Sequence, residues 1–191
     1  MSNKTECLLS TTGCLHVYNR GVDRNTIFHR IRDYDYFMEL MADSMVDSNI
    51  RLLLHCLLPN HFHFVVQQAK AYAVSNFVKR VCEVYAKHLN STRSRSGHLF
   101  QDRFKAKLVE DQASLIRLSR YIHFIPVTSG VVESISKWKY SSIQAYIDSK
   151  NQGFVTVDPI LRLVGGRDEY LKFLREYDPA VPDSVWDFIR R

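Results

Sequence analysis

His61 and His63 stand on either side of Phe62, in an apolar run that continues through Phe64 and Val65. In a β-strand, side chains at positions i and i+2 point to the same face, so the two imidazoles would project side by side. Two unpaired imidazoles are costly to bury, whereas neutral imidazole nitrogens are common ligands of divalent metals. The spacing therefore predicts a metal site on one strand face. A pair of ordinary half-buried histidines is the alternative for this motif taken alone.

Positive charge concentrates in the middle of the chain. The formal net charge is +6, which permits binding to a polyanion but is shared by many proteins without that role. Lysines and arginines gather between residues 79 and 107, around a Ser/Gly-rich loop at residues 91–98 and beside Phe100 and Phe104. Cations interleaved with aromatic rings favour single-stranded nucleic acid. A solvated basic face beside a flexible loop is the equal alternative.

Length and composition indicate one folded domain with an appendage. The chain has 191 residues, of which 46% are hydrophobic. No stretch approaches the ~20 consecutive apolar residues of a membrane span, and the polar start at residues 1–6 lacks the order of a signal peptide. We therefore expect a cytoplasmic protein. The four cysteines are scattered without a Cys-x-x-Cys pair, which indicates neither a zinc ribbon nor a disulfide framework.

The elements that must position the histidines follow from hydrophobic periodicity. Strands are expected at residues 14–20, 50–58, 61–67 and 104–109. Helices are expected at residues 32–46, 73–89 and 113–124, the last of them stopped by Pro126. This order predicts an α+β fold with a ferredoxin-like split βαββαβ unit, an antiparallel sheet with helices on one face.

The pattern weakens beyond Gly130. We expect residues 1–130 to form the main domain and residues 131–191 to form a helical C-terminal extension packed on or near it. Short helices are expected at residues 138–147 and 168–177, and Pro159, Pro179 and Pro182 are expected to interrupt the remainder.

A nucleophile near the metal would give the histidine pair a function, and Tyr121 on the third expected helix is the candidate. Four ordered motifs carry a resemblance, at residues 16–21, 58–63, 97–105 and 119–123. With them the sequence resembles the single-tyrosine HUH transposases, and most closely the REP-associated tyrosine transposases, over roughly its first three quarters. Without the other motifs, Tyr121 would be taken for a helix tyrosine packed on the sheet.

The resemblance implies a metal-dependent single-strand DNA endonuclease and strand transferase that acts on hairpin-associated DNA, with residues 1–130 as its catalytic domain. His61 and His63 would bind Mg²⁺ or Mn²⁺, and Tyr121 would attack the scissile phosphate to form a 5′-phosphotyrosine link. The unperturbed pKa of tyrosine is near 10, so a neighbouring cation that favours phenolate makes the attack feasible. The chain carries no phosphate-loop motif for a nucleotide cofactor.

Ile125 is a departure from the family pattern. Members usually carry Asn four residues after the tyrosine, where it can complete the metal site, and residues at i and i+4 share a helix face. His123 would not replace it, because it lies about 200° around the helix from Tyr121. Water or a DNA oxygen could supply the missing ligand. A domesticated DNA-hairpin-binding protein with weak or no cleavage is therefore the alternative function.

DNA contacts are expected from polar and basic residues that also have a plain surface interpretation. They are Asn19, Arg20, Arg24, Lys79, Arg80, Arg103 and Lys105. His98 and Gln101 receive no role. A hydrolase of small phosphate substrates is a third possibility, which the basic track disfavours because a small substrate needs no extended run of cations. Related enzymes include dimers and monomers, and the long extension favours a monomer over a homodimer.

Overall fold

Four strands form one antiparallel sheet in the computed structural model, which describes residues 13–46 and 48–177. The strands are β1 (Cys14–Arg20), β2 (Ile50–Leu58), β3 (His61–Gln68) and β4 (Lys105–Val109). The α-helices are α2 (Ile31–Met45), α3 (Ala73–Thr92), α4 (Gln112–Thr128), α5 (Ile143–Ile147), α6 (Asp158–Val164) and α7 (Arg167–Arg175). Short 3-10 turns are η1 (Val22–Arg24), η2 (Ile135–Lys137) and η3 (Ser149–Asn151).

The sheet order β2-β3-β1-β4 confirms the predicted split βαββαβ unit. In this order the two connecting helices link strands that are not neighbours, and β1 and β3 become the central pair. The antiparallel register sets Tyr18 opposite His63 on β3 and opposite Lys105 on β4. Residues from three separate strands thus meet in one row across the sheet.

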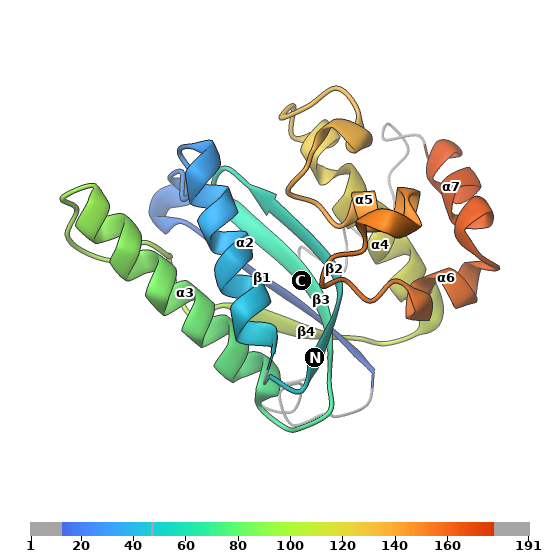
Figure 1. Cartoon of the computed structure of the whole chain (residues 1–191), viewed down its shortest axis with the longest axis horizontal. Coiled ribbons are helices and arrows are strands. Elements are labelled where there is room, and N and C mark those ends of the chain that lie inside the picture. The colour runs from blue at the N-terminus through green and yellow to red at the C-terminus, as the bar shows by residue number, and fades with distance from the viewer. Residues whose placement is uncertain (1–12, 47, 178–191) are drawn as a thin grey trace.

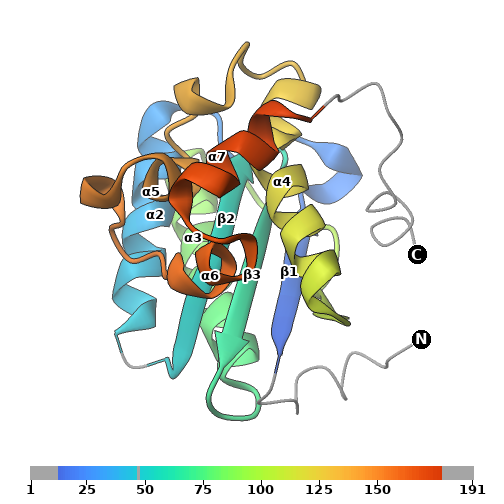
Figure 2. The same cartoon turned by 90° about the vertical axis from the view of Figure 1, so that its right-hand side faces the viewer.

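Helices cover both faces of the sheet (Figure 1). The two helices of the βαββαβ unit, α2 and α3, lie on one face as predicted, against Phe62 and Phe64. The third helix, α4, lies on the opposite face together with α5, α6 and α7, as Figure 2 shows from the side. β2 is buried on both faces from Leu52 to Leu58, so apolar side chains on each side need a helical layer. The histidines of β3 therefore face α4.

Helix α4 continues through Pro126 to Thr128, so the predicted stop before the proline is wrong. Proline has no backbone N–H, so near the C-terminal end of a helix it removes only one backbone hydrogen bond. The last turn is closed by other donors. The N–H of Ser129 donates to the carbonyl of Ile125 (2.9 Å), and the N–H of Val131 donates to the carbonyl of Pro126 (2.8 Å).

Two segments after Gly130, around Tyr140 and around Thr156, run along the outer edge of β2. Backbone bonds join Leu57 N to Tyr140 O (2.9 Å) and Thr156 N to Leu52 O (2.8 Å). This contact covers a sheet edge that would otherwise expose unpaired backbone groups. Helix α6 was missed because Pro159 was interpreted as a break, whereas proline is favoured in the first turn of a helix. Pro179 and Pro182 lie outside the described residues.

The short helix predicted at residues 138–147 is present only over its second half, as α5. Helix α7 matches the helix predicted at residues 168–177 to within two residues at each end. Their buried side chains, among them Tyr146 and Tyr170, pack with α4, β2 and β3 in one apolar cluster. Within the part of the chain that the structure describes, no helix combines the length and apolar character needed to cross a bilayer.

Gly21 ends β1 and fixes the loop that carries Arg24. Its N–H donates to the carbonyl of Asn60 (2.9 Å), which ties this loop to the turn before His61. A Cβ at Gly21 would overlap the carbonyl oxygen of Asn25 and lie 2.9 Å from Cγ2 of Ile27. The close approach therefore requires glycine.

Gly21→Ala is expected to lower the free energy of unfolding by about 2–4 kcal/mol, since a backbone oxygen must move to admit the methyl group. Urea denaturation followed by circular dichroism measures this. Gly153→Ala is the control. Its site is open space but has a positive φ, so we expect a loss of only about 1 kcal/mol. Equal losses in the two variants would contradict the steric explanation.

Candidate active site

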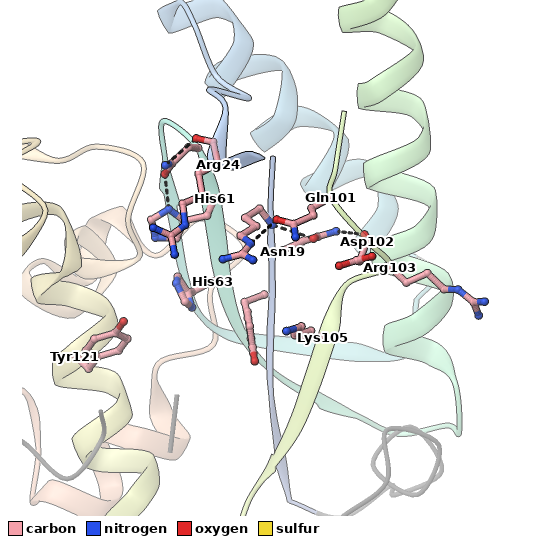
Figure 3. Close-up of a pocket in the computed structure, with 12 residues that line it drawn as sticks. Asn19, Arg24, His61, His63, Gln101, Asp102, Arg103, Lys105 and Tyr121 are labelled. Atoms are coloured by element: carbon pink, nitrogen blue, oxygen red, sulfur yellow. Dashed lines mark hydrogen bonds between the residues drawn. The ribbon is translucent and has the colours of Figure 1, made fainter. Parts of the chain in front are cut away.

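A cavity of about 490 Å³ opens on the α4 face of the sheet. Figure 3 shows His61 and His63 on β3, with Tyr121 of α4 across the pocket from them. The lining residues come from β1, η1, the turn before β3, β3 itself, the loop before β4, the start of β4, and α4. They are Tyr18, Asn19, Arg20, Arg24, Asn60, His61, His63, Gln101, Asp102, Arg103, Lys105 and Tyr121.

The ring of His61 is oriented by its neighbour Asn60. Its Nδ1 lies 2.6 Å from Oδ1 of Asn60, an atom that can only accept, so Nδ1 carries the proton. The amide of Asn60 in turn donates to the carbonyl of Arg24 (3.2 Å). These two bonds leave Nε2 of His61 as the nitrogen with an available lone pair, and they connect its orientation to the Arg24 loop.

His63 has a comparable partner in His16 on β1. Nδ1 of His63 lies 2.9 Å from Nε2 of His16, and the two rings stack 5.2 Å apart. When His63 donates from Nδ1, its Nε2 keeps a lone pair, as a metal ligand requires. His16 is fully buried, and sequence reasoning gave it no role. The available signal was the alternation of His16 and Tyr18 on β1, which places both on the face of His63.

Burial keeps both candidate ligands neutral. It lowers the pKa of His61 to about 4, with a further contribution from the charge of Arg20. Burial also lowers the pKa of His63 well below its ordinary value, and His16 and His61 lower it further. Metal ligation needs the neutral imidazole, so the site holds both rings in the binding form at neutral pH.

The donor set fits a divalent ion that keeps open coordination positions. The rings of His61 and His63 lie 5.2 Å apart and nearly perpendicular, at 85°. Across residues 13–46 and 48–177, no group of three or more His, Cys, Asp or Glu side chains is arranged to hold a metal. Ile125 is 4% exposed and packs in the apolar cluster, so it adds no ligand. Mg²⁺ and Mn²⁺ accept such sites because water and phosphate oxygens complete their shells.

Tyr121 meets His63 edge-on, with ring centroids 6.1 Å apart and planes at 89°. The structure thus brings together the three residues on which the chemical hypothesis depends. Burial raises the pKa of Tyr121 to about 12, and Cys56 and Tyr177 add to the rise. The phenol is therefore protonated at neutral pH until a positive charge beside it favours the phenolate.

A loop before β4 orients the polar groups at the end of β1. Nε of Arg20 donates to Oε1 of Gln101 (2.7 Å), which supplies a role for Gln101 that the sequence did not. The amide of Asn19 donates to the carbonyl of Asp102 (3.1 Å), while its Oδ1 accepts from the N–H of Arg20 (2.9 Å). Asn19 therefore holds the loop in place, with both ends of its amide engaged.

Apart from Asn19, which lines the pocket and is buried, the predicted DNA-contact residues divide into two groups. Arg20, Arg24, Arg103 and Lys105 are exposed around the pocket. The other two, Lys79 and Arg80, are exposed on α3, which covers the opposite face of the sheet, and they do not line the pocket.

Comparison with known proteins agrees with this architecture. A family described as "Transposase IS200 like" matches residues 11–124. A Haemophilus influenzae protein with the provisional description of a REP-associated tyrosine transposase is 30% identical over 99 residues, which cover 46% of this chain and 55% of that protein. The chain thus aligns with about half the length of this curated relative.

A solved structure of a REP-associated tyrosine transposase bound to a REP hairpin has the same fold. It superposes with a TM-score of 0.63 at 16% identity, covering 78% of this chain and 86% of that one. The family match spans well over half of the 191 residues and includes β1, the histidine pair and Tyr121. The chain belongs to the IS200-like transposase family, and the resemblance to REP-associated tyrosine transposases found in its sequence is confirmed.

Proposed function

We propose that this protein is a metal-dependent single-strand DNA endonuclease and strand transferase with Tyr121 as its nucleophile. The observation that carries the proposal is the meeting of α4 and β3 in one pocket, where the Tyr121 ring lies 6.1 Å from that of His63. Two neutral imidazoles and one phenol from segments about sixty residues apart thus line one pocket that also carries exposed cations, which is the combination that the proposed chemistry needs.

In the proposed reaction the phenolic oxygen of Tyr121 attacks phosphorus in line, and the bond from phosphorus to the 3′ oxygen breaks. The phenol releases its proton, the departing oxygen takes one up as a 3′-hydroxyl, and the downstream strand stays on Tyr121 as a 5′-phosphotyrosine. A 3′-hydroxyl can later reverse the step and rejoin DNA, so no nucleotide cofactor is consumed. A divalent ion, Mg²⁺ or Mn²⁺, held through Nε2 of His61 and His63, would polarise the scissile phosphate and favour the phenolate.

The proposed substrate is a DNA hairpin with an adjoining single strand. The structurally similar transposase is bound to a REP hairpin, and the exposed cations around the pocket suit a phosphate backbone. Arg20, which Gln101 holds through Nε, lines the same pocket as Tyr121 and is a candidate contact for the DNA backbone. Because one chain supplies both the histidines and the tyrosine, a monomer suffices for this proposal.

A specific observation favours the second candidate, a hairpin-binding protein with weak or no cleavage. Ile125 follows Tyr121 by one helical turn, and its side chain is buried in an apolar cluster. Within the part of the chain that the structure describes, His61 and His63 are the two imidazoles placed to hold an ion, and a site with two protein ligands would bind it weakly in the absence of DNA. The rate of cleavage would then be low, while the cations that contact the DNA backbone would still bind it.

Tyr121→Phe is expected to abolish the covalent adduct with a 3′-end-labelled hairpin in Mn²⁺, a loss of at least about 10³-fold, because no oxygen remains to attack. Denaturing electrophoresis detects the adduct, and a filter-binding assay should show unchanged affinity. Tyr18→Phe is the matched control, since Tyr18 also lines the pocket. An adduct in Tyr121→Phe, or none with folded wild-type protein in any metal, would refute the nucleophile assignment.

Ile125→Asn separates the two candidate functions. An amide one turn after Tyr121 can ligate the ion, so cleavage should rise by roughly tenfold or more if the missing ligand is what limits the natural chain. Burying the amide is expected to cost about 1–3 kcal/mol of stability, so the melting temperature is measured in parallel. Ile125→Val controls for repacking. Cleavage confined to Ile125→Asn would establish the natural chain as a binder, and equal rates would exclude that alternative.

The two groups of cations are distinguished by the salt dependence of hairpin binding. Replacing Arg20 and Lys105 by Ala should reduce the slope of log Kd against log salt by about 0.7–0.9 for each phosphate that the protein no longer neutralises, the lower value applying to single-stranded and the higher to duplex DNA. The pair Lys79→Ala and Arg80→Ala removes the same charge from α3. A matching change in the second pair would confirm that DNA also runs over α3, and an unchanged slope in the first pair would contradict the proposed path.

A further inference from the structure

Helix α4 presents two buried polar side chains on the side away from the pocket. Ser119 and His123 stand two residues before and two residues after Tyr121, about 200° around the helix from it. Both are fully buried. Burying a hydroxyl and an imidazole is unfavourable unless each finds partners, so their contacts reveal what holds α4.

Their partners belong to the residues after Gly130. The hydroxyl of Tyr170 on α7 lies 2.8 Å from Nδ1 of His123 and 3.0 Å from Oγ of Ser119. Nε2 of His123 lies 2.9 Å from Oγ of Ser142. Tyr170 is itself fully buried. Its single hydroxyl therefore links α7 to two successive turns of α4.

One assignment of protons satisfies every bond in this network. Ser119 donates to the carbonyl of Ile116 (2.7 Å), so its oxygen accepts from Tyr170. The oxygen of Tyr170 then accepts from Nδ1–H of His123, which leaves Nε2 of His123 to accept from Ser142. This order needs a neutral imidazole, and burial lowers the pKa of His123 to about 3. The protons of Ser142, His123, Tyr170 and Ser119 therefore all point along the network in one direction, and removing any one of these groups breaks it.

A second contact lies between the two turns of the network. The guanidinium carbon of Arg120 lies 4.3 Å from the ring centroid of Phe173 and 4.8 Å from that of Tyr177. Residues 119, 120 and 123 of α4 are thus all contacted by α7 or the residues just after it. The inner side of α4, by contrast, packs on the sheet through apolar residues such as Leu118 and Ile122, and such contacts tolerate small rotations.

We propose that Tyr170 is a positioning residue for the reaction, acting through His123 and Ser119 to fix the rotation of α4 and so the direction of the Tyr121 phenol. The proposal rests on the proposed function, because it concerns delivery of that phenol to phosphorus. Cα atoms lie about 2.3 Å from a helix axis and a tyrosine reaches several ångströms further, so a twist of ~20° displaces its oxygen by roughly 3 Å. A misplacement of about 1 Å can cost 10²-fold in rate.

The test compares Tyr170→Phe with Tyr146→Phe in the full chain. Both substitutions keep a buried ring and delete one hydroxyl, but the Tyr146 hydroxyl donates to the carbonyl of Leu53 on β2 (3.0 Å) rather than to α4. We expect similar falls in melting temperature and unchanged hairpin affinity in both variants. The single-turnover rate of adduct formation should fall about tenfold or more in Tyr170→Phe alone. Equal rates in the two variants would overturn the proposal.

A spectroscopic measurement keeps this result separate from the proposed function. With 3-fluorotyrosine at position 121, the ¹⁹F resonance should shift or broaden in Tyr170→Phe and stay unchanged in Tyr146→Phe, whether or not the protein cleaves DNA. An unchanged resonance in Tyr170→Phe would refute the positioning role. A wild-type chain that forms no adduct would instead refute the proposed function. Should Tyr170→Phe fail to fold, Ser119→Ala removes the acceptor of the Tyr170 hydroxyl. This variant should likewise slow adduct formation and shift or broaden the ¹⁹F resonance.

Discussion

The burial of β3 on both faces is the constraint on which the rest of the structure depends. Its alternating side chains put Phe62 and Phe64 into the core under α2 and α3, and this leaves His61 and His63 on the opposite face. A face that carries two imidazoles cannot be packed throughout by apolar side chains, so it is partly closed by α4 and partly open as the pocket. The arrangement of the candidate site is thus a consequence of sheet packing.

The same low-dielectric environment acts in opposite ways on the two kinds of site residue. Burial disfavours the charged form of any group, so it keeps His61 and His63 neutral and ready to ligate, while it raises the pKa of Tyr121 to about 12 and keeps the phenol protonated. A cation placed between them relieves both effects, because it uses the lone pairs and stabilises the phenolate. The neutral imidazoles and the protonated phenol are thus the groups on which the proposed divalent ion would act, while Arg20, whose charge lowers the pKa of His61, and the other cations of the pocket would suit the phosphates of the proposed DNA substrate.

The described residues after Gly130 contact both the sheet and helix α4. They cover the free edge of β2 with backbone bonds, and Tyr170 reaches across to the outer side of α4. Because α4 continues past Pro126, Ile125 stays on the same helix as Tyr121 and packs in the apolar cluster. The identity of residue 125 then matters for function as well as for packing, since it lies one helical turn from Tyr121.

Much of the fold followed from the sequence, because strand periodicity and the i, i+2 rule are local properties. The bounds of β1 and β2 were predicted to the residue, and the His61–His63 pair was recognised as a unit that shares one face. The tertiary structure alone decided that His16 lies against His63, that Tyr170 holds His123, and that α4 covers the face opposite α2 and α3. The first two pairs each span 47 residues of chain. Local periodicity predicts that a side chain is buried but carries no information about which distant segment covers it. That partner is determined only by the packing of the layers in the folded protein.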